Sequence, residues 1–432
     1  MELESLTINP LQNLKYSLFL RRRFWPIFLA TFLGAFNDNL LRSGLVVLIA
    51  YSAGKGIALP ARPEILVTIC SALLVMPLML FSSTAGTLAD KFEKSLLVKI
   101  AKLAELGIMA CAYYGFAHHN ILLLMCLLFV SGTHTTFYSP IKFSILPDHL
   151  HHKELLAGNG FMAGGSYLAV LCGLISGGLL VESQNNAIGV AALTIAAGGL
   201  LASLFILPSR IAHPQTKINF NIWKGSKEII GYACRDKTIL HSILGLSWFL
   251  LVGSVFMSQF ANYAQGVVHA DNEVYILFLT VFSVGIAAGS LLTDTLLKGE
   301  ISLRLTPLAV FGVSLFTYGM VAATPQPMHL ELLDVGAFLA VPQHWLILGC
   351  MTMVAMCGGI YMVPLYATLQ SHTPAEYRSR VMAASNLSDS VFMTAAALLS
   401  ALLLSLGFGI IDLFMLVATL NLPVIYYARK VT

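Results

Sequence analysis

Long apolar segments, separated by short polar ones, repeat along the whole sequence. Twelve of them are long enough to cross a bilayer, which takes about 20 apolar residues. They cover residues 24–51, 63–88, 95–117, 120–140, 157–182, 187–208, 239–265, 273–297, 303–323, 343–369, 380–406 and 408–428. The pattern predicts an all-α integral membrane protein with twelve transmembrane helices.

A polar segment at residues 209–238 divides these spans six and six. Within it, apolar residues such as Trp223 and Ile229 alternate with Lys224 and Lys227, which is typical of an amphipathic segment at a membrane surface. We therefore predict an N-terminal six-helix bundle at 1–208, an amphipathic linker at 209–238 and a C-terminal six-helix bundle at 239–432.

The composition supports a membrane protein, because 57% of the 432 residues are hydrophobic and only 11% are charged. A soluble protein carries about 25% charged residues. The net charge of +4 is small and scattered, so it does not indicate a nucleic-acid partner. The seven cysteines lack the spacing of metal ligands, and we expect neither a metal nor a cofactor.

The basic residues predict the orientation. Of the 25 Lys and Arg, all but three lie at the termini, in the linker, in loops that follow even-numbered spans or at the span ends next to those loops. The exceptions are Arg42 within the first span and Lys55 and Arg62 in loops on the other side. Because basic loops stay in the cytoplasm, both termini and the linker are predicted to be cytoplasmic.

The first span carries four polar residues near its middle: Asn37, Asp38, Asn39 and Arg42. An Asp or Arg at that depth costs roughly 2.5–3.5 kcal/mol on insertion scales. Asp38 and Arg42 are four residues apart, about one helical turn, so each is expected to neutralise part of the other's charge. Either the pair locks this helix to a neighbour, or the helix lines a polar cavity where substrate binds.

The loop between the second and third spans contains Gly86, Asp90, Lys91 and Lys94. It resembles the loop motif of the major facilitator superfamily, whose fold of two six-helix bundles holds substrate between the halves. In that motif the Gly permits close helix contact, and the Asp meets basic groups or a neighbouring helix end. Glu93 stands where the family usually has Gly, which implies an altered gating network. The alternative is a solvated charged turn.

A closer resemblance rests on longer runs. FLGAFNDNLLRSGLVVLI, YSPIKFSILP followed by AGNGFMAGGSYLAVLCGLISGG, and VPLYATLQ are similar to the lysophospholipid transporter (LplT-type) family. They resemble most the transporter part of fused acyl-ACP–phospholipid O-acyltransferase proteins. The resemblance implies a monomer in the bacterial inner membrane that flips lysophospholipids such as lysophosphatidylethanolamine by alternating access. It also implies a separate acyltransferase as partner.

The resemblance implies roles for single residues. Asp38 and Lys142 match polar positions of substrate handling in the family, and Arg42 matches a position that is basic in fused members. Lys142 and Arg42 suit the phosphate of the head group and Asp38 its ammonium, through charge-assisted hydrogen bonds. Two departures imply a different head-group preference: Ala163 replaces an acidic residue of many members, and Val255 replaces an Arg of the stand-alone transporters.

Other polar residues lie within the predicted spans. Asp389 and Asn386 in the eleventh span are candidates for the second half of the cavity, with an interhelical hydrogen bond as the alternative. Tyr138 and His134 belong to a polar patch in the fourth span, where a structural cluster is favoured over a proton relay. Glu105 follows Lys102 by three residues, so we expect a surface pair near the cytoplasmic edge.

Three functions remain open. The first is lysophospholipid transport, and the second is proton-coupled transport of a small amphiphile, drug or siderophore that uses Asp38 and Asp389. The third is a non-transporting membrane partner of the acyltransferase. An ATP-driven pump is disfavoured because the phosphate-binding loop motif is absent, and no nucleophile–base signature indicates an enzyme.

Overall fold

The computed structural model describes residues 18, 21–50, 62–181, 183, 186–209, 211, 214–215, 222–324 and 332–431. Within these residues, twelve helices have 18 residues or more. They are α2 (Trp25–Ala50), α3 (Pro63–Lys91), α4 (Lys94–Ala117), α5 (Ile121–Ser144), α7 (Leu155–Val181), α8 (Ala187–Leu204), α10 (Lys237–Asn262), α11 (Asn272–Leu296), α12 (Thr306–Ala323), α14 (Pro342–His372), α15 (Arg378–Ser405) and α16 (Ile410–Val431).

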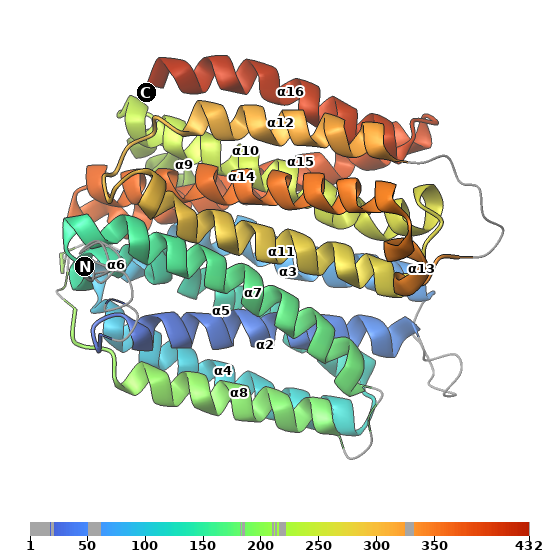
Figure 1. Cartoon of the computed structure of the whole chain (residues 1–432). Coiled ribbons are helices and arrows are strands. Elements are labelled where there is room, and N and C mark those ends of the chain that lie inside the picture. Colours follow the sequence, from blue (N-terminus) through green and yellow to red (C-terminus); the bar gives the residue numbers. More distant parts are fainter. Residues whose placement is uncertain are drawn as a thin grey trace, which may run out of the picture.

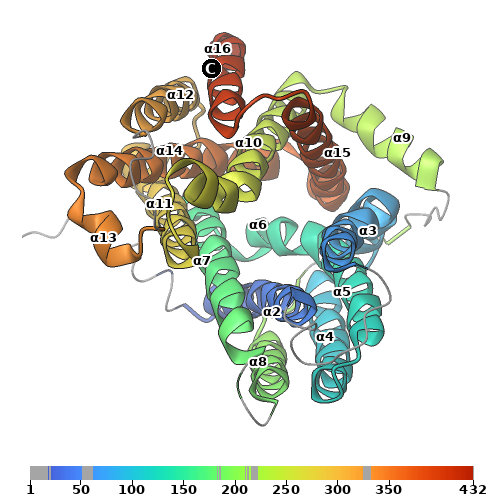
Figure 2. The same ribbon diagram turned by 90° about the vertical axis from the view of Figure 1, so that its right-hand side faces the viewer.

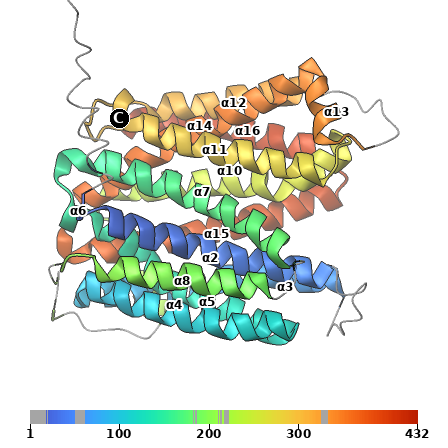
Figure 3. The same ribbon diagram turned by 60° about the horizontal axis from the view of Figure 1, so that its bottom comes forward.

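Short helical segments connect or extend these long helices. They are α6 (Leu146–His149), η2 (His152–Glu154), α9 (Ile222–Ala233), the π-helix η3 (Tyr263–Val267), α13 (Val335–Ala340) and η4 (Ala375–Tyr377). In Figures 1 and 3, α6 lies at one end of the long helices and α13 at the other. An isolated β-bridge joins Ala270 to Leu333.

The all-α membrane fold predicted from the sequence is confirmed. Ten of the long helices are apolar enough to cross a membrane, and Ile410–Tyr426 of α16 is a shorter apolar helix. The helix α4 is as long as the others but carries four charged residues, Lys94, Lys99, Lys102 and Glu105. Where these charges lie decides how α4 fits the bundle, as described below.

One predicted boundary moves by a full turn, with consequences for the site. The fourth span was predicted to end at Pro140, whereas α5 continues to Ser144. Proline removes one backbone hydrogen bond and bends a helix, but the helix can continue beyond it. Lys142 therefore lies in the last turn of α5 and is half-buried.

The long helices run side by side, and Figure 2 looks along them. In this view α2, α4, α5 and α8 lie on one side and α10, α12, α14 and α16 on the other. The helices α7 and α11 pack together across the middle, as do α3 and α15. The partition into 1–208, 209–238 and 239–432 stays a prediction.

Glycines allow backbones to meet at two of these contacts. A Cβ at Gly173 of α7 would lie 2.4 Å from the carbonyl oxygen of Phe36 in α2. A Cβ at Gly289 of α11 would lie 2.1 Å from the carbonyl oxygen of Met356 in α14. Helix association in lipid relies on such close packing of small residues.

The described part of the linker forms α9, which packs on α3 and α15 (Figure 2). Its apolar face buries Ile229 and Ala233, while Ile230 remains 46% exposed. The ring of Tyr232 stacks on Tyr377, just before α15, with centroids 4.4 Å apart. The linker helix thus covers the junction of α3 and α15.

Candidate functional site

Asp38 is held by hydroxyl groups of a neighbouring helix. Ser131 and Thr135 lie one turn apart on α5 and donate hydrogen bonds of 2.6 and 2.7 Å to the two carboxylate oxygens of Asp38. His134, between them in sequence, interacts electrostatically with the same carboxylate. Two hydrogen bonds therefore compensate the burial of this acid within the span.

The other polar residues of α2 point away from Asp38. The Nδ2 of Asn37 donates to Glu105 at 3.3 Å and to the carbonyl oxygen of Ala192 in α8 at 3.1 Å, and Asn37 is fully buried. The Nδ2 of Asn39 donates to the carbonyl oxygen of Ala35 within α2 at 2.8 Å. Successive helical residues diverge by about 100°, so this separation follows from the geometry of α2.

The expected neutralisation of Asp38 by Arg42 is not what the structure shows. The ion pairs between described residues do not include one between these two side chains. Arg42 instead interacts electrostatically with Tyr275 of α11 and Cys70 of α3. Asp38 turns toward the hydroxyl groups of α5, which satisfy it at shorter range.

The prediction of a surface pair at Lys102 and Glu105 is wrong. Lys102 is 0% exposed and Glu105 1% exposed, and the Nζ of Lys102 lies 2.6 Å from Oε2 of Glu105. A Cβ at Gly34 would lie 2.4 Å from that Nζ, so the glycine leaves room for the ammonium. In lipid the polar face of a helix turns inward, which places the pair inside the bundle.

A polar network extends from this buried pair. The Nζ of Lys102 lies 5.0 Å from the centroid of the Tyr138 ring, a cation–π contact. The hydroxyl of Tyr138 forms a 2.8 Å hydrogen bond with Thr31 of α2. The ring of His134 is parallel to that of Tyr138, and its Nε2 meets the carbonyl oxygen of Ala101 at 3.0 Å. Tyr138 therefore links α2, α4 and α5.

Lys142 of the first half and Asp389 of the second half carry opposite charges and interact electrostatically. Lys142 interacts electrostatically with Asp38 of α2 and with Asp389 of α15. The Oδ1 of Asp389 accepts a 2.7 Å hydrogen bond from Ser247 of α10. Tyr366 of α14 also interacts electrostatically with Asp389. One cation thus lies in the field of two carboxylates, one from each half of the chain.

Asn386 makes a direct bond between the halves. Its Oδ1 accepts a 3.2 Å hydrogen bond from Ser139 of α5, and its buried Nδ2 has no hydrogen-bond partner among the described residues.

Asn159 of α7 and Gln370 of α14 exchange two amide hydrogen bonds of 2.7 and 2.8 Å. Both amides are buried, so neither can replace this pairing with water.

Two residues of the loop motif, Gly86 and Asp90, contact the first turns of α15. A Cβ at Gly86 of α3 would lie 2.5 Å from the Cβ of Ala383 in α15, so the helices touch here. Asp90 accepts hydrogen bonds from the backbone nitrogens of Ser379 and Arg380 at 2.9 and 3.2 Å. It also pairs with Nε of Arg380 at 3.0 Å. A carboxylate at a helix N-terminus is favourable, and this one ties α3 to the start of α15.

The two lysines of the motif differ in burial. Lys94 is buried, and its Nζ lies 2.8 Å from Asp148 and 3.2 Å from the carbonyl oxygen of Ser144. Lys91 is half-buried, with its Nζ 5.9 Å from the ring centroid of Phe92. Lys94 therefore belongs to the packing of α4 against the end of α5.

Sequence reasoning missed several partners in this site. It did not identify Ser247 as the donor to Asp389, or the pairing of Asn159 with Gln370. Periodicity could have revealed the buried pair, because Lys102 and Glu105 fall on the same face of α4 as the buried Val98 and Met109. Among the residues the structure describes, no group of three His, Cys, Asp or Glu is placed to hold a metal ion.

Comparison with known proteins adds family and fold. The model of the Major Facilitator Superfamily matches residues 27–334. The Lysophospholipid transporter LplT of Cronobacter sakazakii is 27% identical over 417 residues, covering 94% of this chain and 91% of the relative. The protein of that name from Escherichia coli is 25% identical over 407 residues, covering 92% and 89%.

Solved structures share the fold at low sequence identity. The human organic anion transporter MFSD10 (TETRAN) superposes with a TM-score of 0.71 at 13% identity, covering 94% of this chain and 99% of that one. A bacterial homologue of the iron transporter ferroportin, in an outward-facing state, gives 0.68 at 14% identity, covering 95% and 98%. At such identity these likenesses concern the fold alone.

Proposed function

The chain belongs to the major facilitator superfamily, and from this premise we propose that it moves lysophospholipids across the bacterial inner membrane. It is a multi-pass membrane transport protein. Relatives named as lysophospholipid transporters align with more than nine-tenths of the chain, which supports lysophospholipids as the cargo class.

The observation that carries the proposal is that Lys142, in the last turn of α5, interacts electrostatically with one carboxylate of each half, Asp38 of α2 and Asp389 of α15. A lysophosphatidylethanolamine head group has one phosphate and one ammonium. Lys142 suits the phosphate and the two carboxylates suit the ammonium, and charge-assisted hydrogen bonds are roughly twice as strong as neutral ones. Arg42 lies one turn beyond Asp38 on α2 and offers a second contact for the phosphate.

Transport by alternating access requires the bonds between the halves to break and form again. Asp90 with Arg380, and Asn159 with Gln370, join the halves at the end that the basic loops predict to be cytoplasmic. We propose that this end is closed while these bonds persist and opens when they break. Both chain termini lie on that cytoplasmic side in the proposal, and a separate acyltransferase consumes the delivered lipid.

Head-group specificity tests the proposal with purified protein in liposomes. Replacing Lys142 by Met removes a charge-assisted contact to phosphate, so uptake of every lysophospholipid falls at least about tenfold. Replacing Asp389 by Asn removes a contact to the ammonium, so lysophosphatidylethanolamine uptake falls while lysophosphatidylglycerol uptake is kept. Lys227→Met, in an exposed position of α9, is the matched control and leaves uptake unchanged.

Two outcomes count against this assignment. Uptake by Lys142→Met at the wild-type rate would remove the phosphate contact from the proposal. Equal losses for both head groups in Asp389→Asn would show that Asp389 does not read the ammonium.

One observation favours a second candidate, a proton-coupled transporter of a small amphiphile, drug or siderophore. The hydrogen bonds to Asp38 and Asp389 from Ser131, Thr135 and Ser247 come from hydroxyl groups, which can also accept a hydrogen bond from a neutral carboxyl. Coupling needs a carboxyl that changes protonation between states. An imposed pH gradient that accelerates uptake, with loss of the acceleration in Asp38→Asn, would support this candidate.

A further inference from the structure

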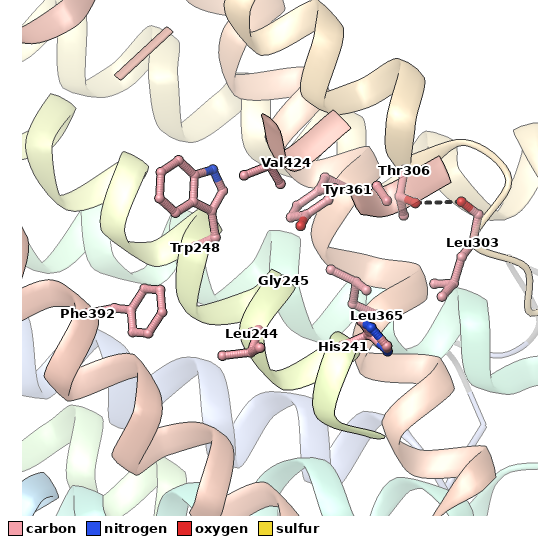
Figure 4. Close-up of a pocket in the computed structure, with 11 residues that line it drawn as sticks. His241, Leu244, Gly245, Trp248, Leu303, Thr306, Tyr361, Leu365, Phe392 and Val424 are labelled. Atoms are coloured by element: carbon pink, nitrogen blue, oxygen red, sulfur yellow. Dashed lines mark hydrogen bonds between the residues drawn. The ribbon is translucent and has the colours of Figure 1, made fainter. Parts of the chain in front are cut away.

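An apolar pocket of about 180 Å³ lies in the second half of the chain, away from the bond between Asp90 and α15. Helix α10 contributes four of its lining residues, α14 and α16 contribute two each, and α12 and α15 contribute one each. In Figure 4, Trp248 and Phe392 lie at one end of the pocket and Leu303 and Thr306 at the other. None of the contacts described above uses this space.

The pocket wall is mostly apolar, and two of its polar side chains, Trp248 and Thr306, are hydrogen-bonded to neighbouring residues. The Nε1 of Trp248 donates to Oδ1 of Asn421 at 2.6 Å, which fixes the indole ring. The hydroxyl of Thr306 donates to the carbonyl oxygen of Leu303 at 2.6 Å. Apolar cavities of about 150 Å³ stay dry and bind apolar molecules. This pocket is therefore suited to hydrocarbon rather than to water.

The pocket is open because residue 245 has no side chain. A Cβ at Gly245 would lie 2.8 Å from the hydroxyl oxygen of Tyr361 and 3.1 Å from a Cδ of Leu365. A larger residue at this position would fill the space between α10 and α14. Gly245 thus provides a direct way to close the pocket by mutation.

The pocket shares two helices with the polar site. Ser247, adjacent to Trp248 on α10, donates a hydrogen bond to Asp389. Phe392 follows Asp389 by three residues on α15, about one helical turn. A molecule with a charged head at Lys142 and Asp389 and a hydrocarbon chain could therefore occupy both places, since the same helices line both.

We propose that this pocket receives the end of the single acyl chain of the transported lipid while the head group is bound at Lys142 and Asp389. The inference rests on the proposed function and adds to it a chain-length dependence. Each methylene that the pocket shields from water, compared with a chain left exposed in the polar site between the halves, improves binding by about fourfold. The pocket accordingly makes the protein prefer long-chain lysophospholipids over short-chain ones.

Chain-length selectivity in liposomes tests the inference. Gly245→Leu fills the pocket, so uptake of palmitoyl-lysophosphatidylethanolamine falls at least about tenfold. Uptake of the hexanoyl form, whose short chain buries far fewer methylenes in the pocket, is expected to change less than about twofold. Gly253→Leu is the matched control on α10, because a Cβ at Gly253 meets nothing within 4 Å. Equal losses for both lipids in Gly245→Leu would overturn the inference.

Should Gly245→Leu fail to reach the membrane, Leu365→Ala tests the same inference in the opposite direction. It enlarges the pocket, so the preference is expected to move toward longer or bulkier chains. An unchanged preference would count against the pocket.

Fluorescence gives a binding measurement that does not require transport. Of the four tryptophans, only Trp248 is kept, and Trp25, Trp223 and Trp345 are replaced by Phe. A lysophospholipid brominated near its chain end should quench Trp248 saturably in an unbrominated bilayer. The quenching should disappear in Gly245→Leu.

Two results would refute the inference. Equal quenching in Gly245→Leu would place the chain elsewhere. Quenching by a brominated diacyl bilayer, but not by the brominated lysophospholipid, would identify a bilayer lipid as the occupant. Absence of lysophospholipid uptake by the unmutated protein refutes the proposed function instead. The quenching of Trp248 then tests by itself whether the pocket binds an acyl chain.

Discussion

Removing one charge of the buried pair on α4 should destabilise the protein more than removing both. Glu105→Gln leaves the ammonium of Lys102 without its carboxylate in a position that is 0% exposed. Lys102→Met leaves Glu105 with only the 3.3 Å hydrogen bond from Asn37. The double variant removes both charges and keeps an apolar side chain of similar length at residue 102.

The separation of the two charges sets the magnitude. At 2.6 Å and an effective dielectric constant of about 20, their attraction is about 6 kcal/mol. Breaking a buried pair from one side costs about 3–5 kcal/mol, whereas replacing both partners is often nearly neutral. We expect about 3 kcal/mol for Glu105→Gln, because the new amide can still accept a hydrogen bond from Lys102.

Denaturant unfolding of the purified variants measures the interaction free energy of Lys102 and Glu105 as a double-mutant cycle. Both single variants should unfold at lower denaturant concentration than the unmutated protein, and the double variant should recover most of the loss. Lys99→Met, a half-buried position on the same helix, is the control and should have little effect. Additive losses in the double variant would show that Lys102 and Glu105 do not stabilise one another and would refute the reasoning.

Two further predictions concern contacts between helices. Asn159→Ala leaves Gln370 buried without its partner, at a cost of about 1–3 kcal/mol, so the predicted cytoplasmic end should open more often. Spin-label distances across that end should then lengthen, and unchanged distances would contradict this prediction. Gly289→Ala should lower the melting temperature because its Cβ would lie 2.1 Å from a carbonyl oxygen of Met356, whereas Gly253→Ala should not; equal melting temperatures would show that the helices move apart freely.

The helices could be predicted because bilayer thickness fixes the length of an apolar span. The errors arose where apolar content alone was followed. The span of α5 was ended at Pro140, although a helix can continue past a proline, and Lys142 therefore fell outside the predicted span. The charges of α4 were placed outside, although its outer face exposes apolar residues such as Ile100 and Leu103.

The site could be predicted only in part. A carboxylate within the membrane is costly, so the sequence predicts that Asp38 has a hydrogen-bond partner. Which hydroxyl groups act as donors depends on how α5 packs on α2, and the sequence does not show this. The divergence of Asn37 and Asn39 from Asp38 follows from helical geometry. The pocket at Gly245 had no sequence signal, because five helices that are distant in the chain contribute to its wall.

Uptake of radiolabelled lysophosphatidylethanolamine by the purified protein in liposomes tests the central claim most directly. The comparison is with a panel of cationic drugs and siderophores, each with and without an imposed pH gradient. We expect saturable lysophospholipid uptake that is lost in Asp38→Asn. Uptake of a panel compound, together with no lysophospholipid uptake, would contradict the claim and assign a different cargo to this fold.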